Sequence, residues 1–211
     1  MVNFYVGWAI VGAILLGLAI LAGHVTEPKS VLGILIDERG RFSLNRLQLV
    51  MWTLLIFSTL LGLAFSTADL KLGQIPPEYL PLVGISAATG VLAGAVKASK
   101  DVRGAVVQRQ GKFAVDAAGT RLPLQQALAK ARDEDVGPHF AQVFLEEEGQ
   151  GADRVVNVTK FQNFILTLAL GIWFLVGVIR QAKFPELDPN VIWLLGISHA
   201  TYVGGKVPDK P

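Results

Sequence analysis

Hydrophobic residues gather in five uncharged runs along the chain, separated by polar segments. The first, residues 4–23, is long enough at about 1.5 Å per helical residue to cross a hydrocarbon core of about 30 Å. Four more runs follow, and none contains Asp, Glu, Lys or Arg: 47–65, 79–96, 161–179 and 191–205. The pattern predicts an all-α integral membrane protein with five transmembrane helices.

The first and last runs need separate interpretation. No basic segment precedes the first run and no small-residue cleavage site follows it, so we interpret it as a mature helix and not as a signal peptide. The last run, 191–205, gives only about 22 Å of helix. It must use its polar flanks, thin the bilayer locally or enter without crossing. We favour a full crossing because it pairs in sequence with the longer run 79–96.

Basic residues are distributed unevenly between alternate loops. Segments 24–46, 97–160 and 206–211 hold 4, 10 and 2 Lys or Arg residues, whereas segments 66–78 and 180–190 hold 1 and 2. Loops rich in Lys and Arg stay on the cytoplasmic side of a membrane. The asymmetry therefore predicts an N-terminus outside and a cytoplasmic C-terminus.

The composition supports a membrane protein and excludes several kinds of site. Hydrophobic residues make up 52% of the chain and charged residues only 17%, outside the range of soluble domains. The absence of cysteine excludes disulfides, thiolate metal sites and a cysteine nucleophile. A net charge of +2 is too small to indicate nucleic-acid binding.

An internal repeat relates two helical hairpins. Residues 43–48 (SLNRLQ) align with 157–162 (NVTKFQ) at an offset of 114, and 84–89 (GISAAT) align with 196–201 (GISHAT) at an offset of 112. Both units begin on the same side, so the repeat is parallel. It divides the chain into an N-terminal helix with its connector (1–41), a first hairpin (42–97), a cytoplasmic insert (98–156) and a second hairpin with a short tail (157–211).

The aligned polar positions have structural explanations. Ser43 and Asn157 are good N-caps. Arg46 and Lys160 then follow at the cytoplasmic boundary, where we expect them to anchor the helices at the headgroups. Gln48 and Gln162 lie deeper and are expected to face protein, because an amide is costly against lipid.

Small residues recur at helical spacing in the second helix of each hairpin. Small side chains at intervals of four let helix backbones approach closely, and Ser or Thr hydroxyls bond within or between helices. We interpret these positions as a helix-packing seam; a row of polar groups facing an aqueous path is the alternative. The positions are Gly84, Ser86, Ala88, Thr89, Gly90, Gly94, Gly196, Ser198, Ala200, Thr201 and Gly204.

At these motifs the sequence resembles a family of bacterial inner-membrane proteins whose function is unassigned. The first hairpin carries S-L-x-R-x-Q and then W-T; the second carries K-x-Q, F-P-x-L and L-L-G-I-S-H-A-x-Y-x-x-x-K, which ends at Lys206. The resemblance covers residues 42–97 and 157–206. It implies a location in the bacterial inner membrane and brings no reaction with it.

The sequence gives little indication of chemistry. His199 is the only His, Asp, Glu, Lys or Arg residue within a run. It could have a proton-relay or gating role, and the alternative is a hydrogen-bonded structural histidine. The acidic residues 146–148 lack the spacing of a calcium loop, and the glycines near residues 104–119 form no phosphate-binding motif. We therefore predict no catalytic residue, cofactor or metal.

Two cytoplasmic segments are candidates for contact with other proteins. The insert 98–156 has too few large apolar residues for a core of its own, so it is expected to lie on the membrane surface, on the hairpins of the same chain or on a partner. We expect a cytoplasmic protein partner to be recognised there. The short apolar stretch 31–36 either is buried against the bundle or forms a docking strip.

The features together favour a non-enzymatic membrane subunit, in contact with membrane lipids, that anchors or scaffolds a larger complex or a homo-oligomer. The alternative is a homo-oligomeric channel or pore-forming effector, with the Ser, Thr and Gln residues of the hairpins lining a path between protomers.

Overall fold

The structure is a computed structural model, and it describes residues 3–25, 30–37, 40–67, 75–102, 138–147 and 154–207, with only the backbone described from residue 97 to 102. These residues form five α-helices: α1 (Phe4–Val25), α2 (Leu44–Thr67), α3 (Leu80–Val102), α5 (Val158–Gln181) and α6 (Pro189–Gly204). Short 3-10 helices precede α2, α3 and α5: η1 (Gly33–Leu35), η3 (Pro77–Tyr79) and η4 (Phe140–Val143). The predicted all-helical fold is confirmed for this part of the chain.

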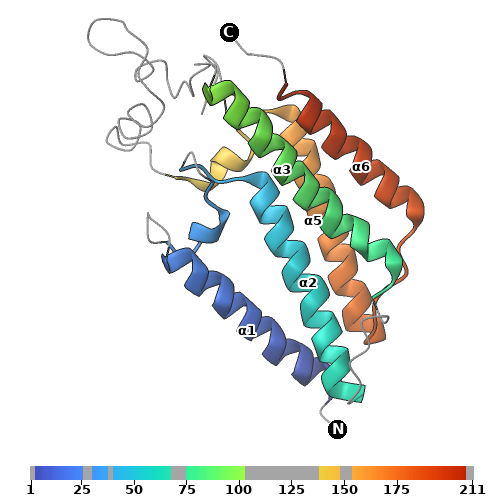
Figure 1. Cartoon of the computed structure of the whole chain (residues 1–211). Helices are drawn as coiled ribbons and strands as arrows, with labels where there is room; N and C mark the ends of the chain where they lie inside the picture. Colours follow the sequence, from blue (N-terminus) through green and yellow to red (C-terminus); the bar gives the residue numbers. More distant parts are fainter. Residues whose placement is uncertain are drawn as a thin grey trace, which may run out of the picture.

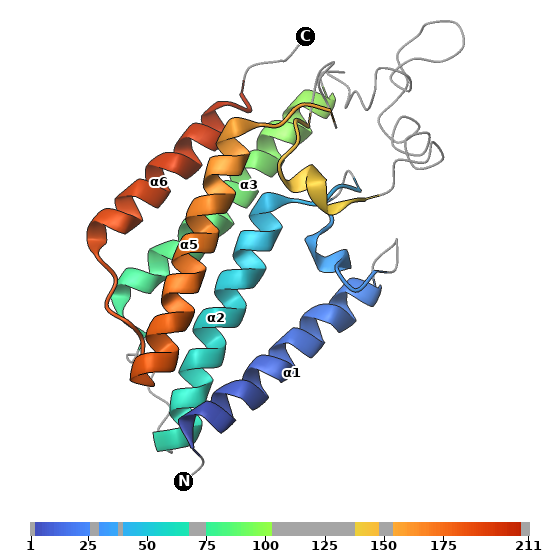
Figure 2. The same cartoon turned by 180° about the vertical axis from the view of Figure 1, so that it is seen from behind.

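The helices run up and down beside one another (Figure 1). Helices α2 and α5 begin, and α3 and α6 end, at one end of the bundle, where η4 also lies; we call this the insert end. The other end, where each hairpin turns, is called the turn end. Helix α2 packs against α1, α3 and α5, and α6 packs against α3 and α5. The view from behind shows α1 diverging from α2 toward the insert end (Figure 2).

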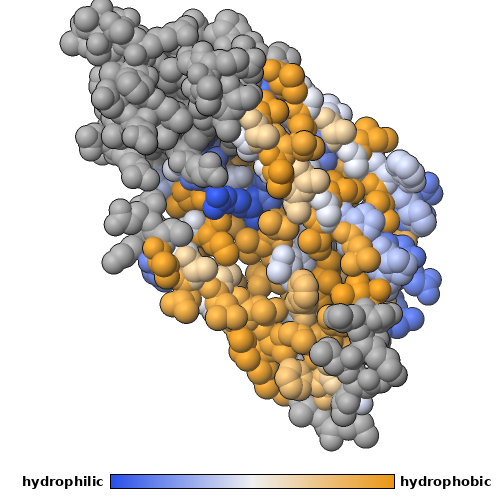
Figure 3. Space-filling view, in the orientation of Figure 1, coloured by the Kyte–Doolittle hydropathy of each residue, from blue (hydrophilic) through white to orange (hydrophobic). Residues whose placement is uncertain are grey.

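Four helices are long and apolar enough to cross a membrane: α1, α2, α3 with the preceding 3-10 turn, and α5. Helix α6 has 16 residues, about 24 Å of helix. Most of its exposed side chains are nevertheless apolar, and Trp193 and Ile197 are among them. Figure 3 shows a surface that is largely hydrophobic along the helices. These four helices and this surface are compatible with a membrane protein, while the fifth crossing remains a prediction.

The half of the interior nearest the turn end is aromatic. Trp52, Tyr79 and Phe174 are almost fully buried, and their rings meet edge to face, with centroids 5.4 Å apart for Tyr79 and Phe174. The Tyr79 hydroxyl donates to the carbonyl of Pro185 at 2.5 Å, which joins the turns of the two hairpins. Burying apolar area gains little free energy when the alternative surroundings are lipid. Close packing and hydrogen bonds of this kind therefore determine how the helices are arranged in this half.

Close backbone contact between helices occurs where α1 crosses α2. A Cβ atom on Gly62 would lie 2.9 Å from the Cα of Trp8, and one on Gly7 would lie 3.3 Å from the Cβ of Phe65. The indole of Trp8 donates to the Ser58 hydroxyl at 3.1 Å in the same crossing. The tightest glycine contact between long helices therefore falls outside the repeated motif that predicted a packing seam.

A second hydrophobic cluster closes the insert end. Leu35, Ile36, Phe42, Leu44 and Val143 are buried together. Single antiparallel bridges pair Ile36 with Phe42 and Leu145 with Val156. Of the two interpretations of segment 31–36, burial therefore holds for its second half, because Leu35 and Ile36 are buried while Val31 and Leu32 remain exposed.

The two hairpins do not bury equivalent faces at the offsets that align their sequences. The buried residues of α5 match those of α2 at an offset of 115, not 114: Lys160, Asn163 and Thr167 correspond to Asn45, Gln48 and Trp52. One residue is about 100° of rotation on a helix. The repeat therefore stays a prediction from sequence. Positions that the sequence alignment makes equivalent differ in whether they are buried.

Candidate functional site

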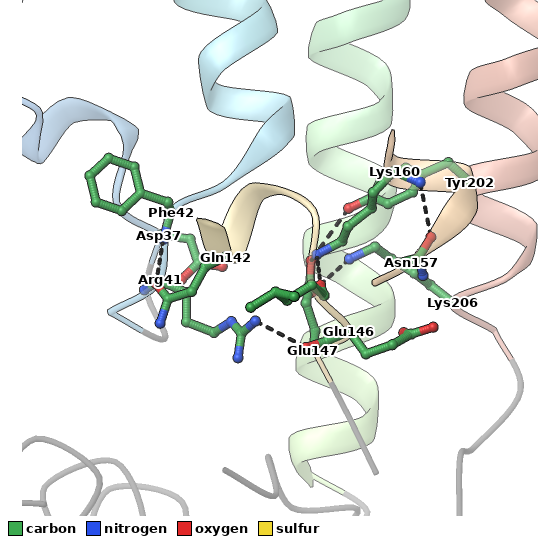
Figure 4. Close-up of polar contacts among 11 residues, drawn as sticks. Asp37, Arg41, Phe42, Gln142, Glu146, Glu147, Asn157, Lys160, Tyr202 and Lys206 are labelled. Carbon is green, nitrogen blue, oxygen red and sulfur yellow. Dashed lines mark hydrogen bonds and ion pairs between the residues drawn. The ribbon is translucent and has the colours of Figure 1, made fainter. Parts of the chain in front are cut away.

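Charged side chains converge at the insert end on the carboxylate of Glu147 (Figure 4). Lys160 Nζ lies 2.6 Å from Oε1, and Lys206 Nζ lies 2.7 Å from Oε2. Lys160 comes from the first turn of α5 and Lys206 follows α6, so one carboxylate ties both helices of the second hairpin to the end of the insert. We call Glu147, Lys160 and Lys206 the ionic clamp.

Further hydrogen bonds hold residues 138–147 against the bundle. The fully buried amide of Gln142 accepts at Oε1 from the backbone N–H groups of Phe42 and His139, each at 3.2 Å. Arg41 donates from Nη2 to the carbonyl of Glu146 at 3.0 Å. The segment is thus fixed to the connector before α2 as well as to the second hairpin.

The local sequence explains why Lys160 points inward. Asn157 caps α5, as predicted, because its side chain accepts from the Lys160 N–H at 2.9 Å. Lys160 is consequently in the first turn, and its Nζ reaches back to the carbonyl of Leu145 at 2.8 Å. At the other end of the hairpin Asp188 caps α6, with its side chain accepting from the Asn190 N–H.

The two predicted interface anchors, Arg46 and Lys160, have different environments in the structure. Arg46 is exposed, as a headgroup anchor should be, whereas Lys160 is only 2% exposed and faces the clamp. The prediction for Lys160 was wrong because Glu147, a residue of the insert, supplies a partner for the ammonium group. A buried lysine needs such a partner, since an unpaired buried charge is expensive.

A layer of polar side chains crosses the bundle below the clamp, and all four helices of the hairpins contribute to it. Gln48 Nε2 donates to Thr167 Oγ1 at 2.6 Å between α2 and α5. Thr89 Oγ1 lies 2.9 Å from His199 Nδ1 between α3 and α6.

Asn163 and Ser198 bond to each other between α5 and α6 and complete the set. These six residues are called the polar layer. Gln48, Asn163 and His199 lie four to five residues from the insert-end terminus of their helices.

The polar layer corrects one prediction for the paired glutamines. Gln48 faces protein as expected, but Gln162 is exposed and Asn163 is the buried amide. The cause is the one-residue shift of burial in α5. Lys160, Asn163 and Thr167 are spaced at i, i+3 and i+7, which places them on one helix face. This spacing in the sequence could have predicted that Asn163, and not Gln162, faces inward.

The residues of the predicted packing seam divide between inside and outside. Ser86 and Ser198 are buried with Thr89, and Ser86 Oγ donates to the carbonyl of its own helix at Leu82. A Cβ atom built on any of Gly84, Gly90, Gly94 or Gly204 meets nothing within 4 Å, and one on Gly196 only reaches Ile85 at 3.9 Å. Ala88, Ala200 and Thr201 are exposed. These glycines therefore form no close contact within the described chain.

The other sequence candidates have limited roles in the described residues. His24 lies in the last turn of α1, and His139 precedes η4. Of the acidic run 146–148, Glu147 belongs to the clamp and residue 148 lies outside the described residues. The described side chains include no group of three His, Asp or Glu residues placed to hold a metal ion. The loose alternation of residues 112–122 favours a hairpin and the helical spacing of residues 123–133 favours a helix, but both segments lie outside the described part.

A pocket opens beside the clamp at the start of α5 and the end of α6, with a volume of about 50 Å³. The buried ring of Tyr202 forms one wall, and its hydroxyl is 3.5 Å from Glu147 Oε1, at the outer limit for a hydrogen bond. The Lys206 ammonium group lies 4.7 Å from the centroid of that ring. The remaining lining residues are Glu146, Glu147, Asn157, Thr159, Lys160, Thr201 and Gly205.

Comparison with protein-family models, curated proteins and solved structures finds no match to this chain. The resemblance to bacterial inner-membrane proteins stays a prediction.

Proposed function

We propose that the protein is a non-enzymatic subunit of a bacterial inner-membrane complex, which it anchors or scaffolds. The observation that carries the proposal is the outward position of the small residues on α3 and α6. Gly84 and Gly94 have open space where a side chain would be, and neighbouring Ala88 is exposed. A transmembrane helix of a second protein, or of a second copy, can approach such a face closely.

The insert end supports the same proposal. The clamp and the Gln142 hydrogen bonds fix residues 138–147 to the membrane bundle. The insert 98–156 would then be attached to the bundle through residues 138–147 and lie in the cytoplasm, with the N-terminus of the chain outside. A partner bound to the insert would be held at the membrane surface.

A channel formed between protomers is less well supported. Such a pore needs Ser86, Thr89 and Ser198 on the outer face of the chain, but all three are buried inside it. Thr201 and Gln162 are exposed, although the hydroxyl of Thr201 is already bonded to the carbonyl of Ile197 in its own helix. Lining a path between chains would require the hairpins to open.

The test is association of the full chain after gentle solubilisation, measured by native mass and by the proteins that co-purify. Gly84→Leu with Gly94→Leu fills the outward face of α3 and should abolish the assembly without unfolding the chain. Gly17→Leu is the matched control, because a Cβ at Gly17 also meets nothing within 4 Å. A chain that is monomeric and without companions would contradict the proposal, and ion conductance abolished by Ser198→Leu would replace it with the channel.

A further inference from the structure

Several buried polar atoms in and around the polar layer lack a hydrogen-bond partner among the described residues. They are Asn45 Oδ1, Gln48 Oε1, Trp52 Nε1 and His199 Nε2. Gln48 is fully buried, and Trp52 and His199 are at most 2% exposed. Leaving one such atom unpaired costs about 1–3 kcal/mol, so four together are expensive in a protein of ordinary stability.

Three of these atoms lie along one face of α2. Asn45, Gln48 and Trp52 are spaced at i, i+3 and i+7, so they follow one another down the helix from the insert end. His199 is buried on α6, and its Nδ1 is already engaged with Thr89 of α3. Either tautomer of the ring therefore leaves Nε2 in need of a donor or an acceptor.

Two residues that line the pocket beside the clamp lie one helical turn from residues of the polar layer. Tyr202 lies one helical turn above Ser198 and His199 on α6, and Lys160 lies one turn above Asn163 on α5. The pocket volume of about 50 Å³ has room for a few water molecules. The long 3.5 Å contact of the Tyr202 hydroxyl with Glu147 leaves that hydroxyl able to bond to water instead.

The opposite side of the layer is closed. Trp52 carries the last of these unpartnered atoms on α2, and its ring meets Phe174, which is fully buried among Tyr79, Leu82 and Leu195. Packed aromatic and aliphatic side chains give water no hydrogen-bond partner.

We propose that the polar layer is a water-binding site: internal waters enter from the pocket at the insert end, bridge Asn45, Gln48 and His199, and stop at the aromatic half of the bundle. The hydrated region is thus open only toward the insert end. His199 is the side chain at which a proton can be exchanged with that water. The site goes beyond the scaffold proposal and does not depend on it.

Solid-state NMR with magnetisation transfer from water tests the site on the full chain in lipid bilayers. His24→Gln with His139→Gln leaves His199 as the only histidine, so its imidazole signal can be assigned without altering the layer. Transfer from water to His199 and to the Gln48 amide should be several times faster than transfer to the Phe174 ring. Gln48→Leu should slow transfer to His199, whereas Gln162→Leu, an exposed control, should not.

Two results would overturn the proposal. Transfer to His199 as slow as transfer to Phe174 would mean that the layer is dry. Fast transfer to both residues would mean a continuous water path through the bundle instead of a hydrated region that is closed at the turn end.

Discussion

Asn163 and Ser198 exchange two hydrogen bonds across the interface of α5 and α6. The Ser198 hydroxyl donates to Asn163 Oδ1 at 2.5 Å, and Asn163 Nδ2 donates to the Ser198 carbonyl at 3.4 Å. Both side chains are at most 5% exposed. Because lipid offers the amide no substitute partner, this pair fixes how the two helices of the second hairpin are rotated against each other.

Removal of either member of that pair should destabilise the second hairpin. We expect Ser198→Ala and Asn163→Leu each to lower the free energy of unfolding by roughly 1–2 kcal/mol in mild detergent. A double-mutant cycle should show coupling, because the second substitution removes a group that the first has already left unpaired. Strict additivity would mean that the two residues do not interact.

The two glutamines aligned by the repeat should respond differently to the same change. Gln48→Leu removes a buried hydrogen bond to Thr167 and should cost roughly 1–2 kcal/mol of unfolding free energy. Gln162→Leu replaces an exposed amide and should change the unfolding free energy by less than about 0.5 kcal/mol. Equal effects, measured by denaturant or thermal unfolding, would argue against the one-residue shift of burial in α5.

The ionic clamp should release residues 138–147 when its carboxylate is neutralised. Glu147→Gln removes the carboxylate that pairs with the buried Lys160 ammonium group, which should cost roughly 3 kcal/mol and expose this segment to protease. Glu186→Gln, an exposed residue at the turn end, is the control. Unchanged protection of residues 138–147 in the Glu147 variant would show that the other contacts suffice.

The crossing of α1 and α2 should tolerate no side chain at Gly62. The Cβ of Gly62→Val would lie 2.9 Å from the backbone of Trp8, so α1 must move away at a cost of roughly 1–3 kcal/mol. Gly17→Val has open space and should be far milder. Thermal unfolding of the two variants in the same detergent compares them directly, and similar midpoints would contradict the crossing.

The proposed orientation can be measured directly because the chain has no cysteine. His139→Cys introduces a thiol at the insert end, and Lys183→Cys introduces one at the turn end; both positions are exposed. A membrane-impermeant thiol reagent applied to intact cells should label only the second. Labelling of His139→Cys alone would reverse the orientation.

Hydrophobic runs and capping residues predicted the helices well. Asn157 and Asp188 cap α5 and α6 because a short polar side chain before an apolar run has few other uses. The register of burial was harder to predict, because Gln162 and Asn163 are both amides at the same depth and only packing decides which faces inward. Lys160 could not be assigned to a clamp, since its partner Glu147 comes from outside the hairpin and charges at a membrane boundary usually face water.

The clamp also has a consequence for the order of assembly during synthesis. Glu147 leaves the ribosome before both of its lysines, and Lys206 follows it by 59 residues. Glu147 and Lys160 can pair as soon as α5 begins to form, but the second oxygen of the carboxylate must wait until all of α6 has been made. The bridge that holds the earlier elements in place is therefore completed only by a residue made after all of them.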